Sequence, residues 1–100
     1  MTPDMTEAVS QVVRSQLKDP YSAVMGAARV KGRIRNGNRE LVVCGYVNAK
    51  NGFGGYNGQQ PYIGVFSQSS RRFDIVAMGD ESPNAALLIQ GSCRGAGIPI

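Results

Sequence analysis

The stretch of sequence that decides the fold runs from position 28 to position 47 and reads ARVKGRIRNGNRELVVCGYV. Its first part alternates apolar and basic residues, which is the period of two expected of a β-strand. The pair Asn36-Gly37 then favours the positive φ angles of a tight hairpin turn. From Glu40 to Val47 the chain returns with apolar residues on both faces, as is typical of a central strand. The stretch therefore predicts a β-hairpin whose second strand lies inside a sheet.

The chain on either side of this hairpin predicts the remaining elements. Six apolar residues before it recur at the spacing of one helix face: Met5, Ala8, Val9, Val12, Val13 and Leu17. They predict an amphipathic helix that Asp19-Pro20 stops. After the hairpin, Tyr62 to Phe66 and Phe73 to Met78 predict two further strands, and Ser82-Pro83 predicts the start of a short helix toward Cys93. We expect an α+β fold in which the N-terminal helix packs on a four-stranded antiparallel sheet, with a short C-terminal helix.

Length and composition indicate a single domain of ordinary globular type. One hundred residues make one domain, and we expect an ordered core over about residues 4–93 with a loose tail at 94–100. No stretch approaches the roughly 18 to 20 uninterrupted apolar residues of a membrane span. Residues 1–18 lack a basic start followed by an apolar run, so no signal peptide is visible. The chain is either cytosolic or begins after a leader that has been removed.

The residue types present argue against an enzyme. The chain has no histidine, which excludes a Ser-His or Cys-His nucleophilic pair. Most carboxylates fall at helix starts or turns, where capping and solvation explain them. An enzyme would need a concave pocket with perturbed carboxylates around Glu40 or Asp74. Two cysteines without a nearby pair predict no metal site, and we expect no cofactor.

The two cysteines, Cys44 and Cys93, lie in a predicted strand and at the end of a predicted helix. A disulfide between them would close a loop of about 50 residues and stabilise the fold by roughly 4 kcal/mol in the chain-entropy model. It would also indicate an oxidising compartment. The alternative is two buried free thiols, which are common in cytosolic proteins. We favour the disulfide.

The segment from position 43 to position 58 reads VCGYVNAKNGFGGYNG and is the first candidate binding surface. A strand leads into a loop rich in glycine and asparagine, with one cation and two aromatic rings. Its candidate contact residues are Asn48, Lys50, Asn51, Phe53 and Tyr56. Backbone amides there could cradle an anion, although the spacing matches neither a phosphate loop nor a dinucleotide fingerprint. The structural alternative is a bulged connection whose rings fold back onto the core.

The second candidate surface is a set of cations on one side of the first strand. Its members, called here the basic face, are Arg29, Lys31, Arg33 and Arg35. The chain has a net charge of +4, and a cationic surface raises affinity for nucleic acid, anionic lipid or acidic proteins. The alternative is a solvated strand face without a partner.

Two elements of this sequence resemble a family. Residues 17–23 read LKDPYSA and residues 43–56 read VCGYVNAKNGFGGY. With Cys93, they resemble a group of small exported proteins of proteobacteria and their phages, and the likeness covers about residues 5–66. The resemblance implies an export or lipoprotein signal in the precursor and a periplasmic or envelope location. It also strengthens the disulfide, and it implies no reaction, cofactor or catalytic residue.

These observations lead to two expectations of function. The first is a non-enzymatic periplasmic or envelope module that presents the 48–58 loop to a protein or glycan partner. The second is a small nucleic-acid-binding domain that uses the basic face, with cytoplasm as the alternative location.

Overall fold

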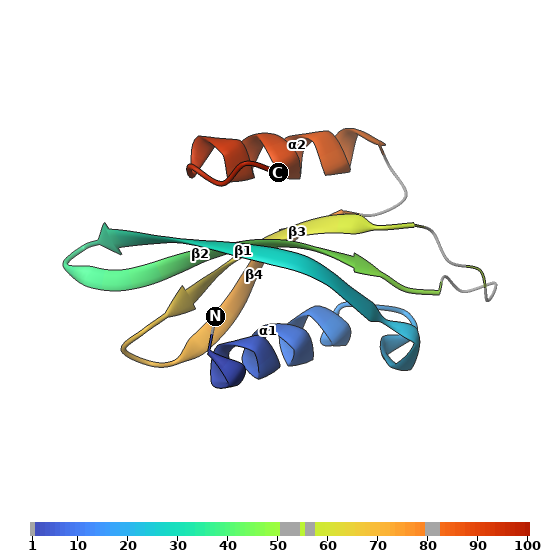
Figure 1. Ribbon diagram of the computed structural model, residues 1–100, viewed down its shortest axis with the longest axis horizontal. Coiled ribbons are helices and arrows are strands. Elements are labelled where there is room, and N and C mark those ends of the chain that lie inside the picture. Colours follow the sequence, from blue (N-terminus) through green and yellow to red (C-terminus); the bar gives the residue numbers. More distant parts are fainter. Residues whose placement is uncertain (1, 51–54, 56–57, 80–82) are drawn as a thin grey trace.

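The fold is a four-stranded antiparallel meander with one helix on each face (Figure 1). The computed structural model describes residues 2–50, 55, 58–79 and 83–100. Its elements in chain order are α1 (Pro3–Ser15), the short 3-10 helix η1 (Pro20–Ser22), β1 (Val24–Arg35), β2 (Asn38–Asn48), β3 (Gln60–Ser67), β4 (Arg72–Met78) and α2 (Pro83–Gly95). The sheet order is β1-β2-β3-β4. The α+β architecture expected from the sequence is therefore confirmed.

Helix α1 ends earlier than the proline signal predicts. Thr2 is its N-cap and accepts a hydrogen bond from the backbone N–H of Met5 at 3.3 Å. The helix closes at Ser15 because the next two amides bond carbonyls three residues back, from Gln16 to Val13 and from Leu17 to Arg14. Asp19-Pro20 instead begins the η1 turn that leads into β1.

The hairpin between β1 and β2 has the expected two-residue turn. Asn36 and Gly37 have φ angles of 52° and 78°, and Arg35 pairs with Asn38 on either side of them. Strand β1 begins at Val24, four residues before the alternating pattern does. The register shifts between Met25 and Ala28, and this irregularity breaks the period of two that sequence reasoning relies on.

Strand β2 contributes to two separate cores, as its apolar residues on both faces predict. On one face, Val43 and Val47 join the cluster that α1 covers; its buried members are Met5, Val9, Val13, Ala23, Val43, Val47, Tyr62, Phe66 and Phe73. On the other face, the buried cluster under α2 consists of Val42, Cys44, Ile63, Ile89, Cys93 and Ile98. The larger core is thus under α1, and α2 rests on the smaller one.

The C-terminal tail, expected to be loose after Arg94, is packed in part. Helix α2 continues to Gly95, and Ile98 is only 2% exposed. Gly97 has a φ of 87°, and the amide of Ile98 bonds the carbonyl of Cys93 at 2.9 Å. This is a Schellman ending, in which a glycine in the left-handed region turns the chain and the next apolar residue packs back on the helix.

Tyr62 at the centre of the larger core gives a pH prediction. The side chain is fully buried, and loss of solvation raises the pKa of its phenol from 10.0 to about 12. The unfolded chain therefore releases this proton before the folded chain does, so stability present below pH 10 is lost as the pH rises toward 12. We expect the Tyr62→Phe variant to lose less unfolding free energy than the native chain across this window, measured by denaturant titration. Equal losses in both proteins would contradict the assignment to Tyr62.

Candidate functional site

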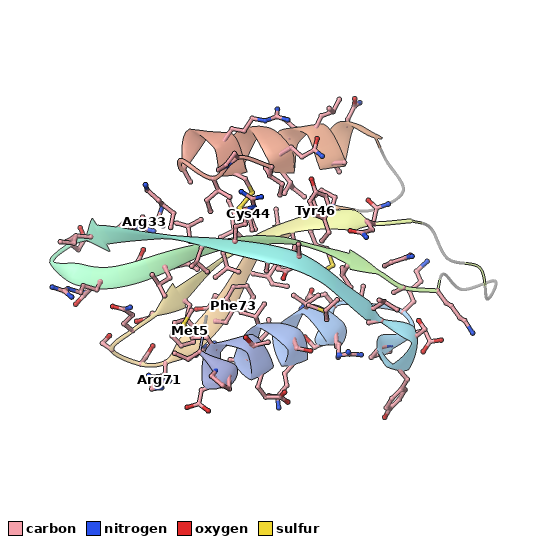
Figure 2. All side chains as sticks on the ribbon, in the orientation of Figure 1. Met5, Arg33, Cys44, Tyr46, Arg71 and Phe73 are labelled. Atoms are coloured by element: carbon pink, nitrogen blue, oxygen red, sulfur yellow. A yellow bond between two sulfur atoms is a disulfide. The ribbon has the colours of Figure 1, made fainter. Side chains whose placement is uncertain are left out.

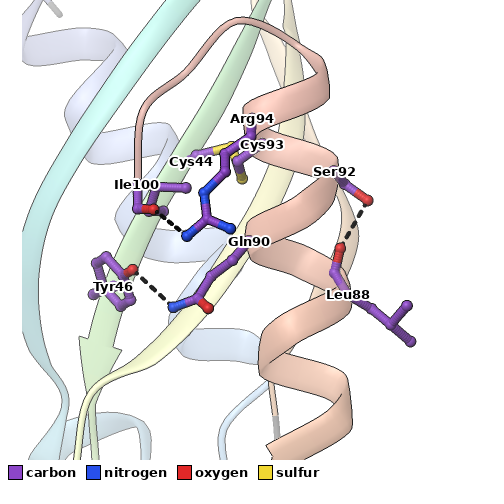
Figure 3. The surroundings of a disulfide bond; sticks show 8 residues. All are labelled: Cys44, Tyr46, Leu88, Gln90, Ser92, Cys93, Arg94 and Ile100. Atoms are coloured by element: carbon purple, nitrogen blue, oxygen red, sulfur yellow. Dashed lines mark hydrogen bonds between the residues drawn. A yellow bond between two sulfur atoms is a disulfide. The ribbon is translucent and has the colours of Figure 1, made fainter.

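A disulfide between Cys44 and Cys93 joins β2 to α2 (Figure 3). Both cysteines are buried, and their Cα atoms lie 6.2 Å apart across 49 residues of sequence. The pairing favoured from the sequence is therefore present, and neither thiol is free. The bond fixes α2 to the central part of the sheet.

Hydrogen bonds beside the disulfide join α2 to β2 and the C-terminal tail to α2. Gln90 Nε2 donates to the hydroxyl of Tyr46 at 3.2 Å, and Arg94 Nη2 donates to the carbonyl of Ile100 at 3.0 Å (Figure 3). Between the tail and the first two strands lies an open pocket of about 360 Å³, to which Arg29 contributes. The C-terminal segment therefore lies next to Arg29, which is the member of the basic face farthest from the hairpin turn.

The basic face lies on the same side of the sheet as the disulfide. The register pairs Arg29 with Cys44, Lys31 with Val42 and Arg33 with Glu40, and paired residues of an antiparallel sheet point to the same face. Helix α2 contacts β3 and β4 and is joined to β2 by the disulfide, and the tail that follows it lies beside Arg29 and Lys31 of β1 without burying them. All four side chains are consequently exposed, as the sequence predicts.

The charges of the basic face are largely uncompensated. Arg33 Nε lies 3.1 Å from Glu40 Oε2 in an exposed ion pair. Within residues 2–50, 55, 58–79 and 83–100, no carboxylate forms an ion pair with the other three cations. The strand therefore presents net positive charge along the edge of the sheet.

The 48–58 loop is described only at its start and close to its end. Asn48 ends β2, and its buried side-chain oxygen has no hydrogen-bond partner among the described residues. Lys50 is exposed, and its backbone amide donates to Ser22 Oγ at 2.9 Å, which ties the loop to η1. The remaining candidates of this surface, Asn51, Phe53 and Tyr56, lie outside the described residues.

The two candidate surfaces occupy different stretches of the sheet. The loop leaves β2 at Asn48, whereas Arg33 pairs with Glu40 eight residues back along the same strand. At about 3.3 Å per residue this is a separation of about 26 Å. Figure 1 accordingly shows the hairpin turn and the start of the loop at opposite ends of the sheet. A small ligand cannot contact Asn48 and Arg33 together.

Of the two carboxylates around which an enzyme would need a pocket, Asp74 lines an open pocket of about 520 Å³ between α1 and β4. Glu40 on β2 pairs with Arg33, and Asp74 on β4 pairs with Arg72 at 3.1 Å. Strand β3 lies between the strands that carry them. In the part of the chain that the structure describes, no three potential metal ligands cluster, and no helix is long and apolar enough to cross a membrane.

One feature of β1 was missed by sequence reasoning. The apolar residues that alternate with the basic face are not buried: Val30 is 37% exposed and Ile34 is 73% exposed. Helix α1 packs mainly against β4, and β1 is the opposite edge strand of the sheet, so the helix leaves these side chains uncovered; the hairpin turn also projects past the end of α1 (Figure 1). The position of α1 across the sheet was the missing information, since it depends on packing between distant elements.

Comparison with known proteins adds no homologue: no family model, no curated protein and no solved structure matches this chain.

Proposed function

We propose that this chain is a non-enzymatic binding module of the cell envelope that binds an anionic protein or glycan through its basic face. The disulfide supports a location outside the reducing cytosol, because such bonds persist in oxidising compartments. The observation that carries the binding role is the array of four exposed cations on one edge strand. Loop residues near Lys50 are proposed as a second contact.

The basic face matches an extended anionic partner better than a compact one. Alternate residues of a strand repeat about every 6.6 Å, so the cations from Arg29 to Arg35 span about 20 Å. A linear polyanion or an extended acidic segment can meet several of them at once. Because the cations are exposed, we expect binding to weaken strongly as salt screens them.

Nucleic acid is the alternative partner, and the described aromatic residues disfavour it. Single-strand binding without base pairing relies on aromatic rings on which bases stack. Tyr62, Phe66 and Phe73 are buried in the larger core, and the hydroxyl of Tyr46 is engaged by Gln90. Among the described residues, the one ring that lines a pocket beside the basic face is that of half-buried Tyr46, next to Arg29, so the face offers phosphate contacts with little stacking surface.

A charge reversal on each side of the same hairpin tests the proposal. Lys31→Glu changes the basic face, whereas Arg39→Glu changes an exposed cation on the opposite face, next to Ile34. Each variant removes one positive charge and adds one negative charge, so the net charge falls from +4 to +2 in both. The probes are fluorescent polyglutamate, heparin and duplex DNA, with affinity read from anisotropy.

We expect Lys31→Glu to weaken polyglutamate or heparin binding by about tenfold at low salt, and Arg39→Glu by about twofold or less. Equal losses for the two variants would show that only net charge matters and would overturn the proposal. So would binding to duplex DNA alone, or the absence of binding to every probe at low salt.

A further inference from the structure

Within the described residues, strand β1 leaves its outer edge without a backbone partner. It is the first strand in the order β1-β2-β3-β4 and is 12 residues long. No backbone group elsewhere in the described chain hydrogen-bonds to it except from β2. An unpaired edge of this kind is a template for a further strand.

The hairpin turn identifies which backbone groups are free. Residues that flank a two-residue turn exchange both backbone hydrogen bonds, so Arg35 directs its N–H and C=O toward Asn38 on β2. Since this direction alternates along a strand, the N–H and C=O groups of Val30, Gly32 and Ile34 face away from β2. These groups form a free hydrogen-bonding ladder on the outer edge.

The side chains along this edge differ between the two faces of the sheet. Arg33 lies on the side that carries Cys44 and α2, clear of the helix, while Met5 and Phe73 lie on the other side (Figure 2). On that other side, the exposed apolar side chains of β1 are Val30 and Ile34. A strand added to this edge would therefore meet cations on one face and apolar groups on the other.

We propose that β1 accepts an extended segment of a partner protein as an antiparallel fifth strand, with acidic and apolar residues alternating along that segment. The acidic residues lie opposite the basic face and the apolar residues lie opposite Val30 and Ile34, where cross-strand pairs of both kinds are favourable. This inference rests on the proposed function, because the basic face supplies the charge complementarity. It narrows the partner from any anionic polymer to a polypeptide.

Two other occupants of the edge fit less well. A second copy of this chain would place cations of one β1 directly beside those of the other, and like charges in opposite positions are unfavourable. An anionic glycan could neutralise the basic face, but it would leave the backbone ladder and the exposed side chain of Ile34 without partners. An acidic polypeptide satisfies the charges, the ladder and the apolar side chains together.

Two peptides that are N-methylated at different residues test strand addition on the native chain. The probe is a peptide of alternating Glu and Val, about ten residues long, which matches the length of β1. In the proposed register the Val amides bond β1 and the Glu amides face solvent. We expect N-methylation of the Val residues to weaken binding by about tenfold or more, and N-methylation of the Glu residues to change it by about twofold or less. Any other order of the two effects overturns the proposal.

A matched pair of protein variants tests the same edge. Gly32→Pro removes a free N–H from the centre of the ladder, and proline is tolerated where a strand N–H faces solvent. Gly32→Ala keeps that N–H, and its new Cβ would meet only Leu41 Cδ2, at an ordinary 3.7 Å. We expect Gly32→Pro to weaken peptide binding by about tenfold, while Gly32→Ala binds like the native chain.

Heparin separates failure of this inference from failure of the proposed function, because it carries charge without a peptide backbone. If heparin binds and Gly32→Pro leaves peptide binding unchanged, strand addition is wrong and the anion-binding module stands. If neither heparin nor the peptide binds, both proposals fall. Concentration-dependent dimerisation in sedimentation that Gly32→Pro abolishes would make a second copy the occupant and overturn the inference. Should Gly32→Pro fail to fold by circular dichroism, the methylated peptides still decide the question.

Discussion

Removal of the Cys44–Cys93 disulfide is expected to lower the free energy of unfolding by about 4 kcal/mol. The bond closes a loop across 49 residues, and its loss returns that conformational freedom to the unfolded chain. A domain of this size has a total stability of only about 5–15 kcal/mol. We therefore expect the melting temperature of the Cys44→Ala/Cys93→Ala variant to fall by about 15–30 °C, measured by calorimetry.

Beyond this global loss, α2 is also expected to open locally, because less buried apolar surface holds it on the sheet than holds α1. Its apolar residues Leu87 and Leu88 are 64% and 73% exposed, and the buried cluster beneath it is the smaller of the two cores. Helix α1, in contrast, buries Met5, Val9 and Val13 in the larger core. Hydrogen exchange of the double variant should therefore show α2 amides losing protection well before α1 amides.

Native chain treated with a reductant is the control for the two new alanine side chains. It should show the same loss of α2 protection and recover on reoxidation. An unchanged melting temperature, or a uniform loss of protection across both helices, would contradict the view that the disulfide holds α2 on the sheet.

Local signals were enough to predict most elements of the fold. The alternation around Lys31 and the Asn36-Gly37 turn fix the hairpin and its register, since both depend on residues adjacent in sequence. The apolar stripe of α1 likewise predicts a helix with one buried face, and Met5, Val9 and Val13 are buried. In both elements, the residues that determine the structure lie within a single helix or hairpin, so a local sequence pattern reveals them.

Some of the features that failed prediction depend on distant parts of the chain. The exposure of Ile34 follows from where α1 lies across the sheet, which no local pattern encodes. The early start of β1 is hidden by the irregularity between Met25 and Ala28. The packed tail was in principle readable, since Gly97 followed by Ile98 is a helix-ending signal.

The sequence predicted which residue types form the candidate site, but it predicted their arrangement in space only in part. The exposed cations follow from alternation with an opposite face, and the cysteine pairing follows from the context of each residue. That the basic face shares a side of the sheet with α2 and borders a free edge depends on strand order. Strand order is set by pairing between elements, so it becomes visible only in the folded chain.

A methyl group added at Gly64 is expected to destabilise the fold by about 3 kcal/mol, because the core there has no room for it. The Cβ of Gly64→Ala would lie 2.6 Å from the backbone oxygen of Asp74 and would overlap the ring of Phe73. The ring belongs to the larger core, and the oxygen belongs to β4, so neither can move without disturbing the sheet. We expect the melting temperature to fall by about 10–20 °C.

Gly32→Ala provides the matched control, since it is the same chemical change on the same sheet in open space. Its Cβ would meet Leu41 Cδ2 at 3.7 Å, and the loss of glycine's freedom in the unfolded chain favours the folded state. We therefore expect its unfolding free energy to stay within about 0.5 kcal/mol of the native value or to rise slightly. Denaturant titration of both variants beside the native chain checks the pair. Similar unfolding free energies for the two variants would mean that β3 and β4 separate at little cost, contrary to the close contact of Gly64 with Phe73.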